Sequence, residues 1–273
     1  MSGTPVNPAI RQVDVHRRGA AGPVADRVAV ELPLQVRLNG EPFSVIMRTP
    51  GADRELALGF LFSEGVVRAR EDVERVVASD SDTVDVHLAG ERRAVALQAL
   101  GSRRQVTMNS SCGLCGRREL ESLRVPLTPL RAGWRVSGNV IAGLPGALLE
   151  AQRAFAETGG LHAAGLFDPD GRLQASAEDV GRHNAVDKLL GRMLDAGALP
   201  LSQSLLVVSG RSSFEIVQKA WLGGIPLVAA VSAPSSLAVD LAREAGITLL
   251  GFVRDGRFNV YAHPERVALT GED

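Results

Sequence analysis

The chain has 273 residues, of which 45% are hydrophobic and 22% charged, and its formal net charge at pH 7 is −1. This is the composition of a globular protein with one large or two smaller domains, and the near-neutral charge argues against a nucleic-acid or membrane-surface role, which needs clustered basic residues. No apolar run approaches the roughly 18 to 20 residues that span a bilayer. The first 22 residues also lack the apolar core of a secretory signal, so we expect a cytoplasmic protein.

Residues 1–26 are expected to form a disordered leader, because several prolines and glycines interrupt them. Alternating apolar residues then predict a strand over Val28–Val36, a turn at Asn39-Gly40 and a returning strand over Phe43–Met47. The elements expected next are a helix from an Asp53 N-cap to Glu64, a short helix over Glu71–Ala78, a strand over Thr83–Leu88 and a partner strand over Arg93–Leu100. We therefore predict a strand-rich α+β domain over residues 27–137.

The second half of the chain has a different pattern. A helix with Leu144, Leu148 and Phe155 on one face is expected to end at Gly159-Gly160. The elements that follow are a hairpin of Leu161–Phe167 and Leu173–Ser176, an amphipathic helix around Val186–Leu194, strands over Leu205–Val208, Pro226–Val231 and Ile247–Val253, helices over Phe214–Leu222 and Ser236–Ala245, and a hairpin at Asp255-Gly256. Alternating strands and helices predict an α/β domain with a parallel sheet over residues 138–273.

Both cysteines of the chain lie in one short loop sequence, Ser111-Cys112-Gly113-Leu114-Cys115-Gly116. A cysteine reacts as its thiolate, which neighbouring cations such as Arg117 and Arg118 favour. In a reducing compartment such a pair is catalytic or metal-binding more often than a disulfide. A zinc knuckle using two histidines from His87, His162 and His183, a thioredoxin-like exchanger and a pair of buried structural thiols remain open alternatives.

A second polar cluster covers Glu178 to Lys188, at the start of the amphipathic helix. The acidic pair Glu178 and Asp179 can cap that helix. Capping does not account for Arg182 and His183, which occupy a helix N-terminus where anions and catalytic groups are common.

Polar loops follow the strands of the predicted parallel sheet. Ser209-Gly210-Arg211 comes after the first of these strands, and Ser232-Ala233-Pro234 comes after the next. Ser212 and Glu215 fit a capping box, whereas exposed amides and Arg211 fit a phosphate site at the sheet edge. The last strand ends in Phe252-Val253-Arg254-Asp255-Gly256-Arg257, which is either a solvated hairpin or a phosphate clamp.

Together these motifs resemble the formate dehydrogenase accessory sulfurtransferases, the FdhD family, over residues 28–263. The matching stretches, in the order of the family, are residues 47–51, 55–57, 59–61, 111–116, 158–164, 178–188, 209–215 and 232–234. The run from Glu178 to Lys188 is the most specific of them, whereas a CxxC pair alone would be weak.

The resemblance implies a sulfurtransferase that takes persulfide sulfur from a cysteine desulfurase. It would pass this sulfur to the molybdenum (or tungsten) bis-guanine-dinucleotide cofactor before the cofactor enters the formate dehydrogenase apoenzyme. Cys112 would carry the sulfur, with Cys115 as the second loop cysteine, and no permanent metal is implied. The segment Phe252–Arg257 would bind the guanine nucleotide, aided by Ser209, Gly210, Arg211 and His183.

The resemblance further implies a homodimer and a three-layer α/β/α domain similar to the cytidine deaminase fold without its zinc site. A non-catalytic chaperone that only binds the cofactor for formate dehydrogenase remains the alternative.

Overall fold

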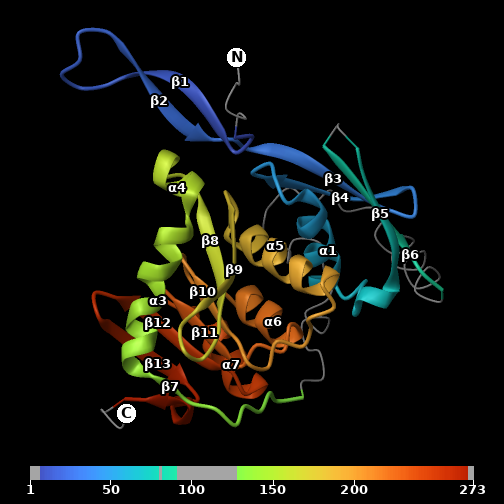
Figure 1. Cartoon of the computed structure of the whole chain (residues 1–273), viewed down its shortest axis with the longest axis vertical. Helices are drawn as coiled ribbons and strands as arrows, with labels where there is room; N and C mark the ends of the chain where they lie inside the picture. The colour runs from blue at the N-terminus through green and yellow to red at the C-terminus, as the bar shows by residue number, and fades with distance from the viewer. Residues whose placement is uncertain (1–6, 80–81, 91–127, 270–273) are drawn as a thin grey trace.

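A six-stranded sheet forms the centre of the fold, with its strands in the order β13-β12-β11-β10-β8-β9 (Figure 1). The structure is a computed structural model and describes residues 7–79, 82–90 and 128–269. The strands of this sheet are β8 (His162–Phe167), β9 (Leu173–Asp179), β10 (Leu205–Val208), β11 (Leu227–Ala230), β12 (Thr248–Arg254) and β13 (Arg257–Ala262). Strands β10, β11 and β12 are parallel to one another, as predicted, while β8 runs antiparallel to β10.

Helices cover both faces of this sheet. Leu205 and Val207 of β10 pack with Ile141 of α3 on one face, and Leu206 and Val208 lie in the larger cluster on the other face. The helices are α3 (Gly138–Ala151) and α4 (Arg153–Thr158) on the first side, and α5 (Arg182–Asp195), α6 (Phe214–Leu222) and α7 (Ser236–Ala245) on the second (Figure 1). Because both faces are covered, β10 and β11 are buried at every position.

The described residues of the N-terminal half add a second sheet and the helix α1. Strands β3 (Leu32–Leu38), β4 (Glu41–Arg48), β5 (Val73–Ser79) and β6 (Thr83–Leu88) form a four-stranded sheet in the order β4-β3-β6-β5. The Asn39-Gly40 turn between β3 and β4 is confirmed, with both residues at positive φ. Helix α1 (Asp53–Ser63) lies between this sheet and α5 and is buried from Leu56 onward.

Helices α1 and α5 meet at two glycines, Gly59 and Gly191. A Cβ atom on Gly59 would lie 1.8 Å from the carbonyl oxygen of Asp187, and one on Gly191 would lie 1.9 Å from that of Glu55. The two backbones therefore touch, and one hydrophobic cluster runs from β3 of the first half to β12 of the second. The division into domains at residue 137, and the likeness of the layering to the cytidine deaminase fold, stay predictions.

Two local predictions between Asp53 and Ala78 are wrong. The helix expected over Glu71–Ala78 is a 3-10 turn (Arg70–Asp72) followed by strand β5, because β6 offers an antiparallel partner to a segment rich in valine. The N-cap of α1 is Ala52 rather than Asp53. The carboxylate of Asp53 instead accepts hydrogen bonds from the buried Arg48 guanidinium.

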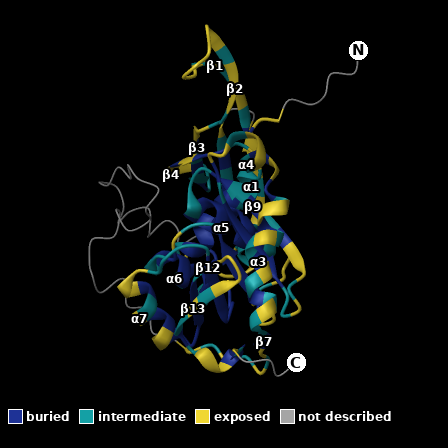
Figure 2. Cartoon of the chain, turned by 90° about the vertical axis from the view of Figure 1, so that its left-hand side faces the viewer, coloured by how far each residue is buried: buried dark blue, intermediate teal, exposed yellow. Residues whose placement is uncertain are grey.

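The leader predicted to be disordered contains a hairpin, which we call the arm: β1 (Ile10–His16) paired antiparallel with β2 (Pro23–Ala29). It extends away from the body and is largely exposed (Figures 1 and 2). At its base, Arg27 pairs with Glu157 of α4. The strand expected over Val28–Val36 is consequently divided between β2 and β3.

The remaining elements agree closely with the predictions. The helix expected to reach Gly159 breaks at Gln152 into α3 and α4, and Gly159 ends α4 in the left-handed conformation. The hairpins β8–β9 and β12–β13 are confirmed. The short strands β7 (Val136–Ser137) and β14 (Val267–Ala268) pair in parallel, next to a 3-10 turn at Pro264–Arg266.

Candidate binding site at the carboxyl edge of the sheet

Three polar loops meet at one edge of the central sheet, because the parallel strands β10, β11 and β12 all end there. The backbone N–H of Ser232, after β11, donates to the carbonyl of Gly210, after β10, at 3.4 Å. The N–H of Phe252 donates in turn to the carbonyl of Ser232 at 3.1 Å. The structure therefore brings together the loop residues that the sequence singled out separately.

The loop after β10, residues 209–213, is anchored to β8. Ser209 N donates to the carbonyl of Ala163 at 3.0 Å, and Ser209 Oγ accepts from Ala163 N at 2.9 Å. Gly210 packs against the His162 imidazole, since a Cβ atom at this position would lie 3.4 Å from it. Arg211 is exposed, so its guanidinium is accessible to an anion.

The capping box, one of the two interpretations of Ser212 and Glu215 that the sequence left open, is not formed. The N-cap of α6 is Ser213, and no side chain caps the helix. Ser212 is fully buried, and its hydroxyl has no hydrogen-bond partner among the described residues. The carboxylate of Glu215 lies instead 3.1 Å from Nε2 of His183.

His183 connects the start of α5 to the start of α6. Its Nε2 atom is 3.1 Å from Ser213 Oγ and 3.1 Å from Glu215 Oε2, and the residue is buried. The imidazole therefore lies in the protein interior behind the loop, where it positions the N-terminus of α6. It does not lie in the solvent-exposed part of the sheet edge.

The hairpin after β12 divides the predicted segment Phe252–Arg257 into core and surface residues. Val253 is fully buried with the residues under α3. Phe252 has a left-handed backbone (φ 55°), and the Arg254 guanidinium lies 5.7 Å from the centre of its ring. Asp255 and Gly256 form the turn at positive φ, while Arg254 and Arg257 pair across it and are exposed.

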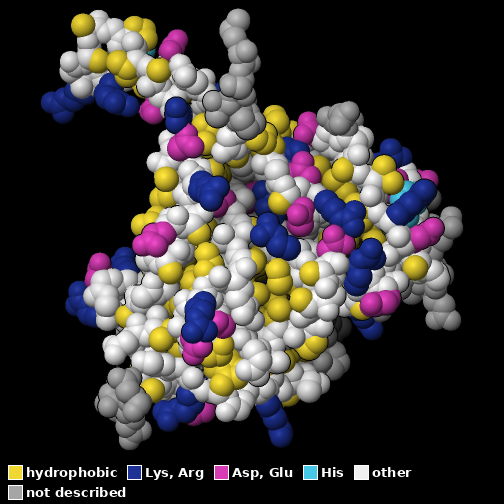
Figure 3. Space-filling model, viewed as in Figure 1, with side chains coloured by type: hydrophobic (Ala, Val, Ile, Leu, Met, Phe, Trp, Pro, Cys, Tyr) yellow, Lys and Arg dark blue, Asp and Glu magenta, His cyan; other side chains and the backbone are white. Residues whose placement is uncertain are grey.

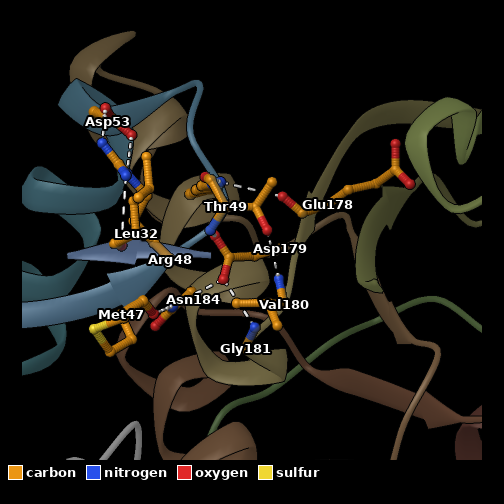
Figure 4. Close-up of polar contacts among 11 residues, drawn as sticks. Leu32, Met47, Arg48, Thr49, Asp53, Glu178, Asp179, Val180, Gly181 and Asn184 are labelled. Carbon is orange, nitrogen blue, oxygen red and sulfur yellow. Dashed lines mark hydrogen bonds and ion pairs between the residues drawn. The ribbon is translucent and has the colours of Figure 1, made fainter. Parts of the chain in front are cut away.

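Most of the charged residues between Glu178 and Lys188 hold the fold together. The Glu178 carboxylate accepts from the N–H groups of Ala154 and Phe155, so it caps α4 and not α5 as predicted. Asp179 is fully buried and accepts from Gly181 N and from Thr49 N (Figure 4). The expectation that this acidic pair caps α5 is therefore wrong.

The same network ties α5 to the loop after β4. Asn184 donates from Nδ2 to Asp179 Oδ1 at 2.9 Å and to the carbonyl of Met47 at 2.8 Å (Figure 4). Lys188 Nζ lies 2.7 Å from Asp179 Oδ2 and donates to the carbonyl of Thr49. Buried charges are tolerated only when paired and hydrogen-bonded in this way, so these residues of the most specific motif have structural roles.

A cavity of about 520 Å³ opens beside this edge, between α3, α4 and the ends of β8, β9, β10 and β11. Ser209 and His162 line it together with Gln152, Leu148 and Phe155. Burial, aided by the nearby Arg182 cation, holds the pKa of His162 below its ordinary value. The sequence indicates His162 only as a zinc candidate and gives no signal for Gln152, because four separate segments have to fold before this cavity exists.

Cys112 and Cys115 lie outside the described residues, as does the strand expected over Arg93–Leu100. Across residues 7–79, 82–90 and 128–269, no cluster of three or more His, Cys, Asp or Glu is placed to hold a metal ion. No helix within these ranges is long and apolar enough to cross a membrane. On the face shown in Figure 3, acidic and basic side chains are interspersed over the body of the molecule.

The central sheet with helices on both faces makes this an α/β protein, and its polar loops meet beside a cavity at the carboxyl ends of its parallel strands, where ligands bind in many such folds. The FdhD/NarQ family matches residues 29–268, and the chain therefore belongs to that family.

Relatives extend over nearly the whole chain. Proteins named "Sulfur carrier protein FdhD" from Streptomyces avermitilis and Anaeromyxobacter dehalogenans are 48% and 49% identical to it, over 95% and 96% of this chain and 95% of each relative. The protein of that name from Sulfurisphaera tokodaii is 48% identical over 89% of this chain and 92% of its own. A crystal structure from Desulfotalea psychrophila, provisionally named as a formate dehydrogenase accessory protein, superimposes with a TM-score of 0.74 at 28% identity, covering 94% of this chain and 98% of that one.

Proposed function

We propose that this protein is a sulfur carrier for formate dehydrogenase maturation. It accepts persulfide sulfur from a cysteine desulfurase and transfers it to the molybdenum (or tungsten) bis-guanine-dinucleotide cofactor, its substrate, before that cofactor enters the apoenzyme. The observation that carries this proposal is the match, over 95% of the chain, to relatives named as sulfur carriers. A cytoplasmic homodimer is part of the proposal.

Cys112 receives the sulfur in this scheme. Its thiolate attacks the terminal sulfur of the desulfurase persulfide, the donor S–S bond breaks, and its electron pair leaves on the donor thiolate. The new S–S bond makes Cys112 a persulfide, with no net oxidation or reduction. Cys115 is the second thiol of the loop, and the adjacent Arg117 and Arg118 favour the thiolate.

The sheet edge binds the substrate. Arg211, Arg254 and Arg257 are exposed where the three loops meet, and guanidinium groups pair well with the phosphates of a dinucleotide. Ser209 and Gly210 contribute the loop backbone close to His162, and Phe252 offers an aromatic face beneath Arg254. His183 acts as a positioning residue behind this loop.

The decisive experiment is intact-mass analysis of the purified protein after incubation with a cysteine desulfurase and cysteine. We expect the gain of one sulfur atom on the peptide that contains Cys112, lost in C112A and retained in R211A. Formate dehydrogenase maturation should fail in a strain that carries C112A. Normal maturation in that strain would contradict the proposal.

A cofactor chaperone without sulfur transfer is the alternative, since the arginine-bearing edge alone could bind a dinucleotide. It predicts that C112A supports maturation while R211A and R254A do not. A zinc module built on Cys112 and Cys115 is distinguished by metal analysis of the purified protein.

A further inference from the structure

A second, smaller cavity lies at the base of the arm, where both halves of the chain contribute to its walls. It is lined by Asn7 and Ala9 of the arm base, the loop 49–52 before α1, the start of α4, the end of β9 and two residues of α5. Its volume of about 240 Å³ is several times the roughly 30 Å³ that a water molecule occupies in the liquid. It lies just below the roughly 300–1,000 Å³ of sites for drug-sized ligands, so the cavity suits a small ion or molecule.

Cations outnumber carboxylates in the lining of this cavity. The lining contains the cations Arg153, Lys188 and Arg192 and one carboxylate, that of Glu178. The Glu178 carboxylate points toward α4, where it accepts from two backbone N–H groups (Figure 4). Lys188 is already paired with the buried Asp179. The two arginines are therefore the cations that are left to bind a ligand.

Neither arginine has a carboxylate partner among the described residues. The carboxylates of Glu157 and Asp195, each close in sequence to one of them, pair with other arginines. Arg153 is exposed at the first position of α4. Arg192 is half-buried, and it donates from Nη1 to the carbonyl of Ser176 at 3.3 Å. A charge that gives up part of its hydration is stabilised when it is paired, so the half-buried guanidinium points to an anion as the missing partner.

We propose that this cavity binds a small tetrahedral oxyanion, of the class of phosphate and sulfate, between Arg153 and Arg192. A guanidinium group binds such oxygens through paired, charge-assisted hydrogen bonds, which are stronger than neutral ones. Because the walls come from separate segments, the bound anion connects the arm base and the loop 49–52 to α4 and α5. The site is distinct from the arginines of the sheet edge, and the inference does not depend on sulfur transfer.

The test is isothermal titration calorimetry of the full chain with inorganic phosphate, at constant ionic strength. R192M removes the half-buried guanidinium, and R153M removes the exposed one, whose loss puts folding at little risk. The matched control is R243M on α7, where the arginine side chain is 64% exposed. Sulfate is the second probe, and chloride at the same ionic strength measures the effect of screening alone.

We expect phosphate and sulfate to bind the wild-type chain and R243M equally. They should bind R153M and R192M at least about ten-fold more weakly, because each variant loses charge-assisted hydrogen bonds. If R192M folds poorly, R153M alone decides the outcome. No binding, an effect that chloride reproduces, or unchanged affinity in either folded variant overturns the inference.

Hydrogen exchange of the wild-type chain locates the bound anion. We expect phosphate to slow exchange within residues 49–55 and 153–155, which border the cavity. Slowing that is confined to residues 209–213 would place the anion at the sheet edge instead and would also overturn the inference.

Discussion

Gly59 of α1 and Asp187 of α5 are in direct backbone contact, since a Cβ atom on Gly59 would lie 1.8 Å from the Asp187 carbonyl oxygen. Gly191 makes the reciprocal contact with Glu55 one turn further along α5. The two helices can approach this closely only because neither position carries a side chain.

Replacing either glycine by alanine should therefore destabilise the protein. We expect G59A and G191A to lower the free energy of unfolding by at least about 1–3 kcal/mol, because the opposing atoms are backbone and the helices have to separate. Urea denaturation measures this. G143A is the matched control: Gly143 also lies in a helix, but nothing lies within 4 Å of the added Cβ. It should be neutral or stabilising, and an equal loss in G143A and G59A would refute the interpretation.

Removing only one partner of the buried ion pair between Asp179 and Lys188 should lower the free energy of unfolding. K188M leaves the Asp179 carboxylate, which is 0% exposed, without its cation. We expect a loss of about 3–5 kcal/mol of unfolding free energy, measured by chemical denaturation.

The double variant D179N/K188M provides the comparison for this pair, because it removes both charges. It should be more stable than K188M. If the double variant is the less stable of the two, the pairing explanation fails, and this comparison remains informative even when K188M folds poorly.

Stability should also depend on pH through His162, whose pKa is lowered by burial and by Arg182. In the unfolded chain this histidine takes up a proton near its ordinary pKa of about 6.5, whereas the folded chain resists protonation until lower pH. The unfolded state therefore binds more protons in that window. The contribution of His162 to stability is complete above about pH 6.5 and is lost as pH falls below it.

Denaturation curves at pH 8 and at pH 5.5 test this expectation. H162Q, which cannot titrate, should show a smaller loss of stability between the two pH values than the wild-type chain. An identical loss in both proteins would contradict the assignment.

Replacement by alanine should destabilise the protein at Ser235 but not at Ser212. The buried Ser212 hydroxyl has no partner among the described residues, so S212A should change stability by less than about 0.5 kcal/mol. Ser235 Oγ caps α7 by accepting from Ala238 N, so S235A should cost about 1 kcal/mol.

Ligand binding supplies the second readout for Ser212. If this hydroxyl serves the substrate, S212A should weaken the binding of guanosine diphosphate while leaving the melting temperature unchanged. Unaltered affinity would show that the hydroxyl has no part in binding.

The sequence predicted the central sheet well, because its signals are local. The strands near Leu205–Val208 and Leu227–Ala230 are short aliphatic runs separated by helices of clear period, and each lies within a residue or two of its expected place. The polar loops after β10 and β11 are expected at one edge because parallel strands end together there, and the structure adds Phe252 to them through its hydrogen bond to Ser232.

Other features depend on partners distant in sequence. The local sequence of β5 predicts a helix, but its pairing with β6 makes it a strand. The local sequence of the arm likewise predicts disorder, whereas the pairing of β1 with β2 orders it. The sequence could indicate that Glu178 caps a helix, but not that the helix is α4 rather than α5. The cavity around His162 and Gln152 is formed by four segments that are distant in sequence. The periodicity of hydrophobic residues within one segment does not show which other segments will pack beside it.

The glycine contact between α1 and α5 also bears on how the chain is built and dismantled. Leu61 of the N-terminal half and Leu189 of the C-terminal half belong to one hydrophobic cluster. If the two halves were produced as separate chains, each would therefore expose an apolar surface to water. Neither half is then a self-sufficient module. We therefore expect the molecule to unfold as one cooperative unit, so that destabilising substitutions near the N-terminal sheet also affect the loops at the edge of the central sheet.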